Sequence, residues 1–210
     1  MPKTVITISR QIGSGGAEVG QIVAARMGLR YVDREILRQA ADVLGLEETE
    51  LSEREERIQT FWEKLGYGLS YGAPDWTFVP PPLLPIPDEE VRHVENDIIR
   101  SVAARENCVI VGRGGFHILE KHPCLVSVLL HAPVEFRIRR VMEIYNVGSY
   151  EKGKPMVEAS DRDRRAFIFS ISGADWMCAR NHQLCIDSSS LPLEDVADLI
   201  VTMANKRERE

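Results

Sequence analysis

The sequence lacks an excess of basic residues, and this absence limits the partners that it can bind. Its 210 residues include 26 Lys and Arg against 32 Asp and Glu, so the formal net charge is −6. A broad basic surface is the usual requirement for binding nucleic acid or an acidic membrane. We therefore expect neither partner, and any site for a small anion must be local.

Long apolar runs and targeting signals are also absent. Every apolar run is far shorter than the roughly 20 residues with which a helix crosses a bilayer. The amino terminus enters a strand pattern directly, without the charged, apolar and small-residue regions of a signal peptide. These absences predict a cytoplasmic protein without a membrane-spanning segment.

Cysteine is scarce, and its spacing is not that of a metal site. The four cysteines form no C-x-x-C pair and no chelating cluster with histidine; they are Cys108, Cys124, Cys178 and Cys185. Three of them lie in or beside apolar runs, so we expect buried, reduced thiols. No side chain is predicted as a metal ligand.

The length and the apolar pattern predict one α/β domain over residues 1–210. A chain of this size with 44% hydrophobic residues suits one sizeable core. Continuous apolar runs at residues 108–111 and 125–130 are typical of strands buried on both faces of a parallel sheet. Periodicity predicts further strands at residues 4–9, 29–32 and 182–187, and helices after residue 17 and at residues 34–44, 47–57, 88–105 and 193–206. Residues 66–87, rich in proline, predict a long loop.

A glycine cluster separates the first predicted strand from the first predicted helix. Gly13, Gly15 and Gly16 can adopt positive φ angles that point successive backbone N–H groups inward, and the helix from Ala17 adds its positive end. This order of strand, glycines and helix predicts a phosphate-binding loop at residues 8–16. An ordinary glycine-rich turn is the alternative.

Two better-known loop patterns fit this segment incompletely. A dinucleotide-binding G-x-G-x-x-G would start at Gly13, but Glu18 occupies the place of its third glycine. A Walker loop has Lys and then Ser or Thr after its last glycine, for the phosphates and for Mg²⁺. Here Gly16 stands at the Lys position, and no Ser or Thr follows. Arg10, at the exit of the strand, is the nearest cation that can replace the lysine.

Five blocks carry a resemblance that covers nearly the whole chain outside residues 47–88. They are residues 6–20, 31–35, 109–114, 132–140 and 161–164, followed by Trp176 and residues 184–189. In this order they resemble the cytidylate kinase-like family, divergent nucleoside-monophosphate kinases of the P-loop NTPase superfamily whose loop begins Ser-Arg-Gln and lacks the usual lysine. The resemblance implies a three-layer P-loop fold, in which helices flank a parallel β-sheet. It further implies an acceptor-side helical insertion at about residues 34–105 and a lid at about residues 146–165.

The resemblance also implies a role for individual residues. The donor phosphates of ATP, bridged by Mg²⁺, would lie on the loop that follows Arg10, at Gly13, Ser14, Gly15, Gly16, Ala17 and Glu18. The acceptor nucleotide would contact Asp33, Arg38, Arg113, Asp161 and Arg164. The candidate catalytic cations are Arg10, Arg137, Arg140 and Arg164.

The chemistry of phosphoryl transfer supports these choices independently. The protein must mainly position two anions and neutralise the charge on the transferred oxygens, so several arginines are the expected equipment. Arg137 and Arg140, at i and i+3, would lie on one helical face and present a paired fork to phosphate. Arg113 follows a buried strand at its carboxyl end, where open α/β sheets bind ligands.

Three functions remain open at this point. The first is ATP-dependent phosphorylation of CMP, dCMP or a similar nucleoside monophosphate. The second is an inactive nucleotide-binding module, which the missing Walker residues favour. The third is a kinase with a non-nucleotide acceptor, because Phe167, Ile168 and His182 replace tyrosines that relatives carry and the proline-rich segment lies where the acceptor is enclosed.

Overall fold

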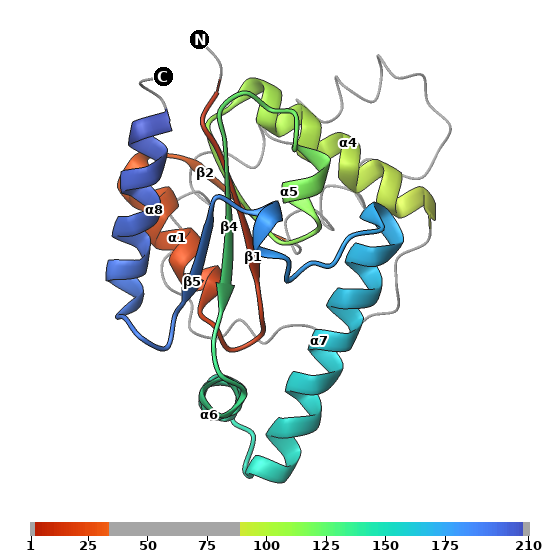
Figure 1. Cartoon of the computed structure of the whole chain (residues 1–210), viewed down its shortest axis with the longest axis vertical. Helices are drawn as coiled ribbons and strands as arrows, with labels where there is room; N and C mark the ends of the chain where they lie inside the picture. The colour runs from red at the N-terminus through yellow and green to blue at the C-terminus, as the bar shows by residue number, and fades with distance from the viewer. Residues whose placement is uncertain (1–2, 34–88, 208–210) are drawn as a thin grey trace.

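The computed structural model describes residues 3–33 and 89–207, which alternate between strands and helices (Figure 1). The first part holds β1 (Val5–Arg10), α1 (Gly16–Met27) and β2 (Arg30–Val32). The second part holds α4 (Glu89–Arg105), β3 (Cys108–Val111), α5 (Gly115–Ile118), β4 (Leu125–His131), α6 (Val134–Ile144), α7 (Tyr150–Ser172), β5 (Leu184–Asp187) and α8 (Leu193–Arg207). The predicted strands and helices in these ranges are confirmed to within two residues at most ends.

The five strands form one parallel sheet in the order β2-β3-β1-β4-β5. Strand β1 lies at its centre, where Val5 is level with Cys108 of β3 and Leu125 of β4. Every described side chain of β3 is buried, as the continuous apolar runs predicted. The carboxyl ends of all five strands therefore lie at one edge, and the glycine loop after β1 lies at the middle of that edge.

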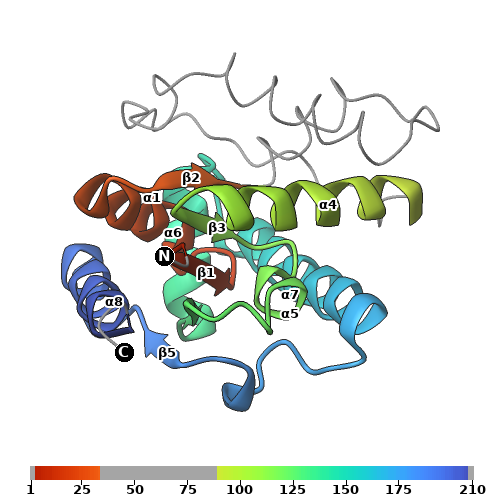
Figure 2. The ribbon, with the colours of Figure 1, turned by 90° about the horizontal axis from the view of Figure 1, so that it is seen from above.

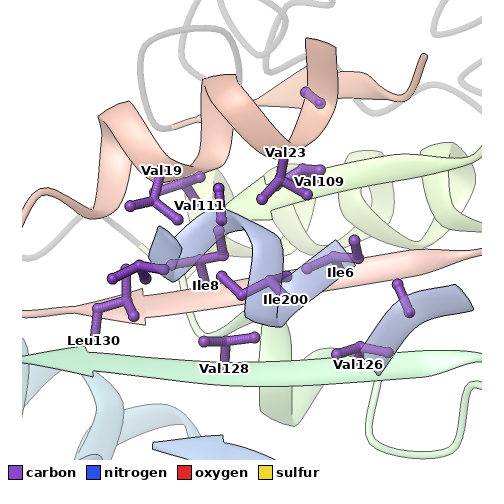
Figure 3. Close-up of a cluster of buried hydrophobic side chains, with 14 of the residues drawn as sticks. Ile6, Ile8, Val19, Val23, Val109, Val111, Val126, Val128, Leu130 and Ile200 are labelled. Atoms are coloured by element: carbon purple, nitrogen blue, oxygen red, sulfur yellow. The ribbon is translucent and has the colours of Figure 1, made fainter. Parts of the chain in front are cut away.

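Helices cover both faces of the sheet, so the fold has three layers (Figure 2). Because strand side chains alternate between faces, Ile6 and Ile8 pack against α1 and α8, with Val19, Val23 and Ile200 in the same cluster (Figure 3). The neighbouring side chains on the opposite face meet α4, where Val5 packs in a second cluster with Val94, Ile98, Ile99 and Val102. The predicted three-layer α/β class is confirmed.

Helices α6 and α7 extend the molecule beyond the carboxyl edge of the sheet (Figure 1). Their contact is apolar: Ile138 and Val141 of α6 pack with Val157 of α7, and Ile12 of the glycine loop joins the same cluster. The loop and the two helices thus share one small core. The lid that the resemblance implies, at about residues 146–165, overlaps α7, which ends at Ser172.

Some predictions lie outside the described residues or are wrong. Arg38, the helices at residues 34–57 and the loop at residues 66–87 are outside the described ranges. The cysteines are free, but only Cys108 is buried, whereas Cys185 is exposed because β5 is an edge strand. Within the described ranges, no helix combines the length and apolar character needed to cross a membrane.

Candidate phosphate-binding site

The glycine loop turns sharply between β1 and α1. Gly13 and Gly15 both have φ of 78°, a left-handed conformation that favours glycine, and Gly15 caps the helix. In the described part of the chain, the N–H groups of Ile12, Gly13 and Gly15 donate to no other backbone group. Backbone N–H groups that make no such bond, beside the positive end of a helix, are suited to binding an anion.

Polar contacts inside the protein fix the shape of this loop. The Ser14 hydroxyl is fully buried and donates to the carbonyl oxygens of Gln11 at 2.8 Å and Leu130 at 3.3 Å. The Gln11 side-chain oxygen accepts a bond from the Ala132 amide at 3.2 Å. Ser14 was predicted to contact the donor nucleotide, and the structure places its hydroxyl toward the protein, where it holds the loop.

The side chain of Arg10 occupies the space beside Gly16, the residue at the Walker lysine position. A Cβ atom added to Gly16 would come within 2.5 Å of the Arg10 Cβ and 2.6 Å of its Cγ. The Arg10 guanidinium then reaches Gly112 at the end of β3, where an added Cβ would collide with it. The glycine at position 16 therefore makes room for the arginine, as expected if Arg10 replaces the lysine charge.

Arg137 is held in place by a carboxylate on the neighbouring helix. Only 4% of its surface is exposed, and its Nε donates to the Ala132 carbonyl oxygen at 3.0 Å. Its two terminal nitrogens donate to the two Asp161 oxygens at 3.1 and 2.9 Å. This bidentate pair joins α6 to α7 and fixes the direction of the guanidinium.

Arg164 lies one helical turn beyond Asp161 and next to further positive charge. Burial, together with the nearby charges of Arg10 and Arg137, lowers the pKa of Arg164 to about 9, although Asp161 and Tyr145 act in the opposite direction. The Arg164 guanidinium donates to the Ser160 hydroxyl, and no described carboxylate forms an ion pair with it. Three guanidinium groups from β1, α6 and α7 thus converge beside the loop.

Arg140 does not form the expected fork with Arg137. Its Nη2 lies 2.5 Å from the Glu18 carboxylate of α1, whereas Arg137 is bound to Asp161. Each arginine is thus directed by a different carboxylate. Arg140 was predicted as a catalytic residue and Glu18 as a nucleotide-binding residue. The structure pairs them beside the first turn of α1, next to the glycine loop.

Arg113 lies in the turn after β3 and is held by a carboxylate of α4. It belongs to a turn in which Gly112, Arg113 and Gly114 all have positive φ, at 83°, 54° and 71°. Its guanidinium is paired with Glu95 of α4, both side chains being at least nine-tenths buried, and lies 4.6 Å from the centre of the Phe167 ring. The acceptor phosphate role predicted for Arg113 would make the phosphate share the guanidinium with this carboxylate.

Tyr31 is the middle residue of β2, and Asp33 follows this strand at its carboxyl end. Burial raises the pKa of Tyr31 strongly, the Asp33 charge adds to this rise, and the Arg10 charge opposes it. Arg10 therefore acts on both sides of the loop. Asp33 stays a predicted acceptor residue.

Sequence reasoning missed two residues of this region, Tyr145 and Glu95. Burial raises the pKa of Tyr145 to about 12, while the nearby charges of Arg164 and Arg10 act to lower it. Glu95 stands beside Val94 on the buried side of α4. A carboxylate next to the apolar stripe of a predicted helix was the signal that could have identified it.

Comparison with known proteins identifies the family. The profile of the cytidylate kinase-like family matches residues 5–190, nearly the whole chain. The chain belongs to the cytidylate kinase-like family. A search of curated proteins found no match.

Solved structures show that this member of the cytidylate kinase-like family has the fold of P-loop kinases. An uncharacterized protein from Eubacterium ventriosum ATCC 27560 has a TM-score of 0.71 at 19% identity, covering 97% of this chain and 99% of its own. A gluconokinase from Sinorhizobium meliloti 1021 has a TM-score of 0.53 at 14% identity, covering 98% and 93%. A shikimate kinase from Bacteroides thetaiotaomicron has a TM-score of 0.50 at 13% identity, covering 99% of both chains. The predicted P-loop NTPase fold is confirmed.

Proposed function

We propose that this member of the cytidylate kinase-like family transfers the γ-phosphoryl group of ATP to a nucleoside monophosphate of the CMP type. Mg²⁺ would bridge the donor phosphates. The observation that carries the proposal is the convergence of Arg10, Arg137 and Arg164 beside a glycine loop with available amides. A cytoplasmic location and small-molecule partners are part of the same proposal.

The charges of the cluster favour a bound polyanion. Asp161 is engaged through both oxygens by Arg137, while Arg164 is partly buried near Arg10 and Arg137. Positive groups that repel one another in a buried site become favourable when an anion enters between them. The oxygens of a transferred phosphoryl group gain such stabilisation without a general base.

Each chain segment has a distinct task in this proposal. The loop amides and the amino end of α1 would bind the donor phosphates, and Arg10 would supply the charge of the missing lysine. Arg137, fixed by Asp161, and Arg164 would approach from the α6–α7 side. Because α6 and α7 share a core with Ile12 of the loop, they can hold these cations at a fixed distance from the bound phosphates.

A non-nucleotide acceptor is the second candidate. Arg113, the predicted contact for the acceptor phosphate, is paired with Glu95 and packed on Phe167. In addition, the similar solved structures include kinases named for shikimate and gluconate, although this likeness concerns the fold. An acceptor without a phosphate would leave the Arg113–Glu95 pair intact.

A coupled ADP-release assay separates these candidates. Purified protein with ATP and Mg²⁺ would be offered CMP, dCMP, the other nucleoside monophosphates, shikimate and gluconate in turn. Turnover on CMP or dCMP supports the first function, and turnover on shikimate or gluconate alone supports the second. ATP binding with no turnover on any acceptor would instead indicate the inactive module, and no ATP binding would contradict all three.

An arginine variant ties the activity to the cluster. Arg164→Met should weaken ATP binding by about tenfold to a hundredfold, because a hydrogen bond to a charged group contributes about 1.5–3 kcal/mol. Arg100→Met is the matched control, since Arg100 is an exposed arginine on α4 with a distant ion pair to Asp97. Equal effects of the two substitutions on ATP affinity would rule out the cluster as the phosphate site.

A further inference from the structure

Glu18 places a carboxylate directly against the glycine loop. It is the third residue of α1, and side chains in a helix point back toward its amino end. Its Oε2 would lie 3.4 Å from a Cβ atom on Gly15, so the carboxylate folds over the loop. About a third of the Glu18 side chain is exposed, which leaves it accessible to a ligand at the loop.

This carboxylate creates an electrostatic problem for a phosphate-binding site. A negative charge beside a triphosphate is repulsive, and the loop has also lost the lysine of a Walker sequence. In the structure the Arg140 Nη2 lies 2.5 Å from the Glu18 Oε2 and balances the charge of this carboxylate. An arginine that is bound to Glu18 cannot give its full charge to a phosphate. A cation between Glu18 and a bound triphosphate would remove this local repulsion.

The donor set fits a divalent cation that arrives with the nucleotide. Mg²⁺ is usually bound by one or two carboxylates together with substrate phosphates and water. Within residues 3–33 and 89–207, no group of three or more His, Cys, Asp or Glu could hold an ion without such phosphates. Asp161 is engaged by Arg137 through both oxygens, whereas Glu18 contacts Arg140 through Oε2 and can offer its second oxygen to a cation beside the loop amides.

We propose that Glu18 is a ligand of the divalent cation that accompanies the donor nucleotide, in place of the missing Walker hydroxyl. In the absence of nucleotide, Arg140 holds the carboxylate. When the metal–nucleotide complex binds, Glu18 contacts the metal and Arg140 is released toward phosphate. This inference rests on the proposed binding of ATP at the loop, and it assigns the metal dependence of that binding to one residue.

The test compares ATP affinity with Mg²⁺ and with EDTA by isothermal titration calorimetry, in the wild type and in Glu18→Gln. The wild type should bind ATP about tenfold or more tightly with Mg²⁺, and the substitution should reduce this ratio by about tenfold, because it removes one charge at close range. The substitution should change the ATP affinities with and without Mg²⁺ in opposite directions. Glu18→Gln should bind metal-free ATP more tightly, since the repulsion is gone, and Mg²⁺–ATP more weakly.

Two further variants separate metal binding from a structural role. Glu106→Gln is the matched control, because Glu106 is a similarly exposed glutamate paired with Arg30 at the opposite, amino edge of the sheet. For Glu106→Gln, the ratio of the ATP affinity with Mg²⁺ to that with EDTA should equal the wild-type ratio. Glu18→Asp keeps the carboxylate and should retain more of the Mg²⁺ dependence than Glu18→Gln.

The outcomes are distinct. If Glu18→Gln keeps the wild-type ratio, or shifts both affinities equally in the same direction, then Glu18 only stabilises the helix or Arg140 and the metal role is wrong. If Glu18→Gln alters the Mg²⁺ dependence of enzymatic turnover but not that of ATP affinity, the role of Glu18 in binding the metal with ATP is also wrong. If the wild type binds no ATP in either condition, the proposed function itself fails.

Discussion

Adding one methyl group at Gly16 should reveal how closely Arg10 has taken over the lysine position. In Gly16→Ala, the new Cβ would lie 2.5 and 2.6 Å from the Cβ and Cγ of Arg10. These atoms are close to the backbone and cannot swing away as the end of a side chain can. Overpacking of this kind costs about 1–3 kcal/mol. For a protein of this size, we expect the melting temperature to fall by about 2–12 °C.

The same substitution should be harmless once the arginine side chain is removed. In an Arg10→Gly background the collision disappears, because both the Cβ and the Cγ of residue 10 are removed. Alanine is then favoured over glycine in a helix by up to about 1 kcal/mol. Gly16 has no positive φ that alanine would disturb. A double-mutant cycle should therefore give a coupling free energy of about 1–3 kcal/mol between positions 10 and 16.

Thermal and urea unfolding of the four proteins measure this coupling, and ATP titration shows its functional side. Gly16→Ala should also weaken ATP binding, because it displaces the cation proposed to bind the phosphates. If Gly16→Ala destabilises the protein equally with and without Arg10, the arginine does not occupy this position. In that case, the substitution of Arg10 for the Walker lysine would lose its structural basis.

Three further predictions concern residues around the site. Glu95→Ala should lower the free energy of unfolding by about 3–5 kcal/mol, because it breaks a buried ion pair with Arg113; urea unfolding checks this, and a loss below about 1 kcal/mol would contradict it. Burial lowers the pKa of His182 below its usual 6.5, so its stabilising contribution is present above pH 6.5 and is lost as the pH falls further; the stability difference between wild type and His182→Gln should shrink between pH 7 and pH 5, and a constant difference would refute it. Exposed Cys185 should react with iodoacetamide in the native protein while buried Cys108 should not, as mass spectrometry of the peptides would show; equal labelling would be inconsistent with the strand positions.

Local sequence patterns were sufficient for the sheet and for the loop. The apolar run at residues 108–111 has the same bounds as β3, since a strand buried on both faces needs continuous apolar side chains. The glycines of the loop were recognisable because positive φ and backbone approach require them. Such features depend on neighbours in the chain, and a single sequence contains them.

Pairings between distant segments could not be read in the same way. Glu18 and Arg140 are 122 positions apart in the sequence. Arg113 is paired with Glu95 of α4, and the sequence does not specify how this helix packs against the turn that holds Arg113. The lid at residues 146–165 came from the resemblance alone, and the local pattern does not indicate one long helix there because Gly153 and Pro155 interrupt it. Cys185 was expected to be buried because its apolar neighbours do not reveal that β5 lies at the sheet edge.

The most direct test of the account is whether the protein forms ADP and a phosphorylated acceptor in equal amounts. Incubation of the wild type with ATP, Mg²⁺ and CMP or dCMP, followed by chromatographic quantification of all nucleotides, should give one nucleoside diphosphate for each ADP, and Arg164→Met should reduce both together. ADP formation without a phosphorylated acceptor, or ATP that binds and stays intact, would contradict phosphoryl transfer at this site.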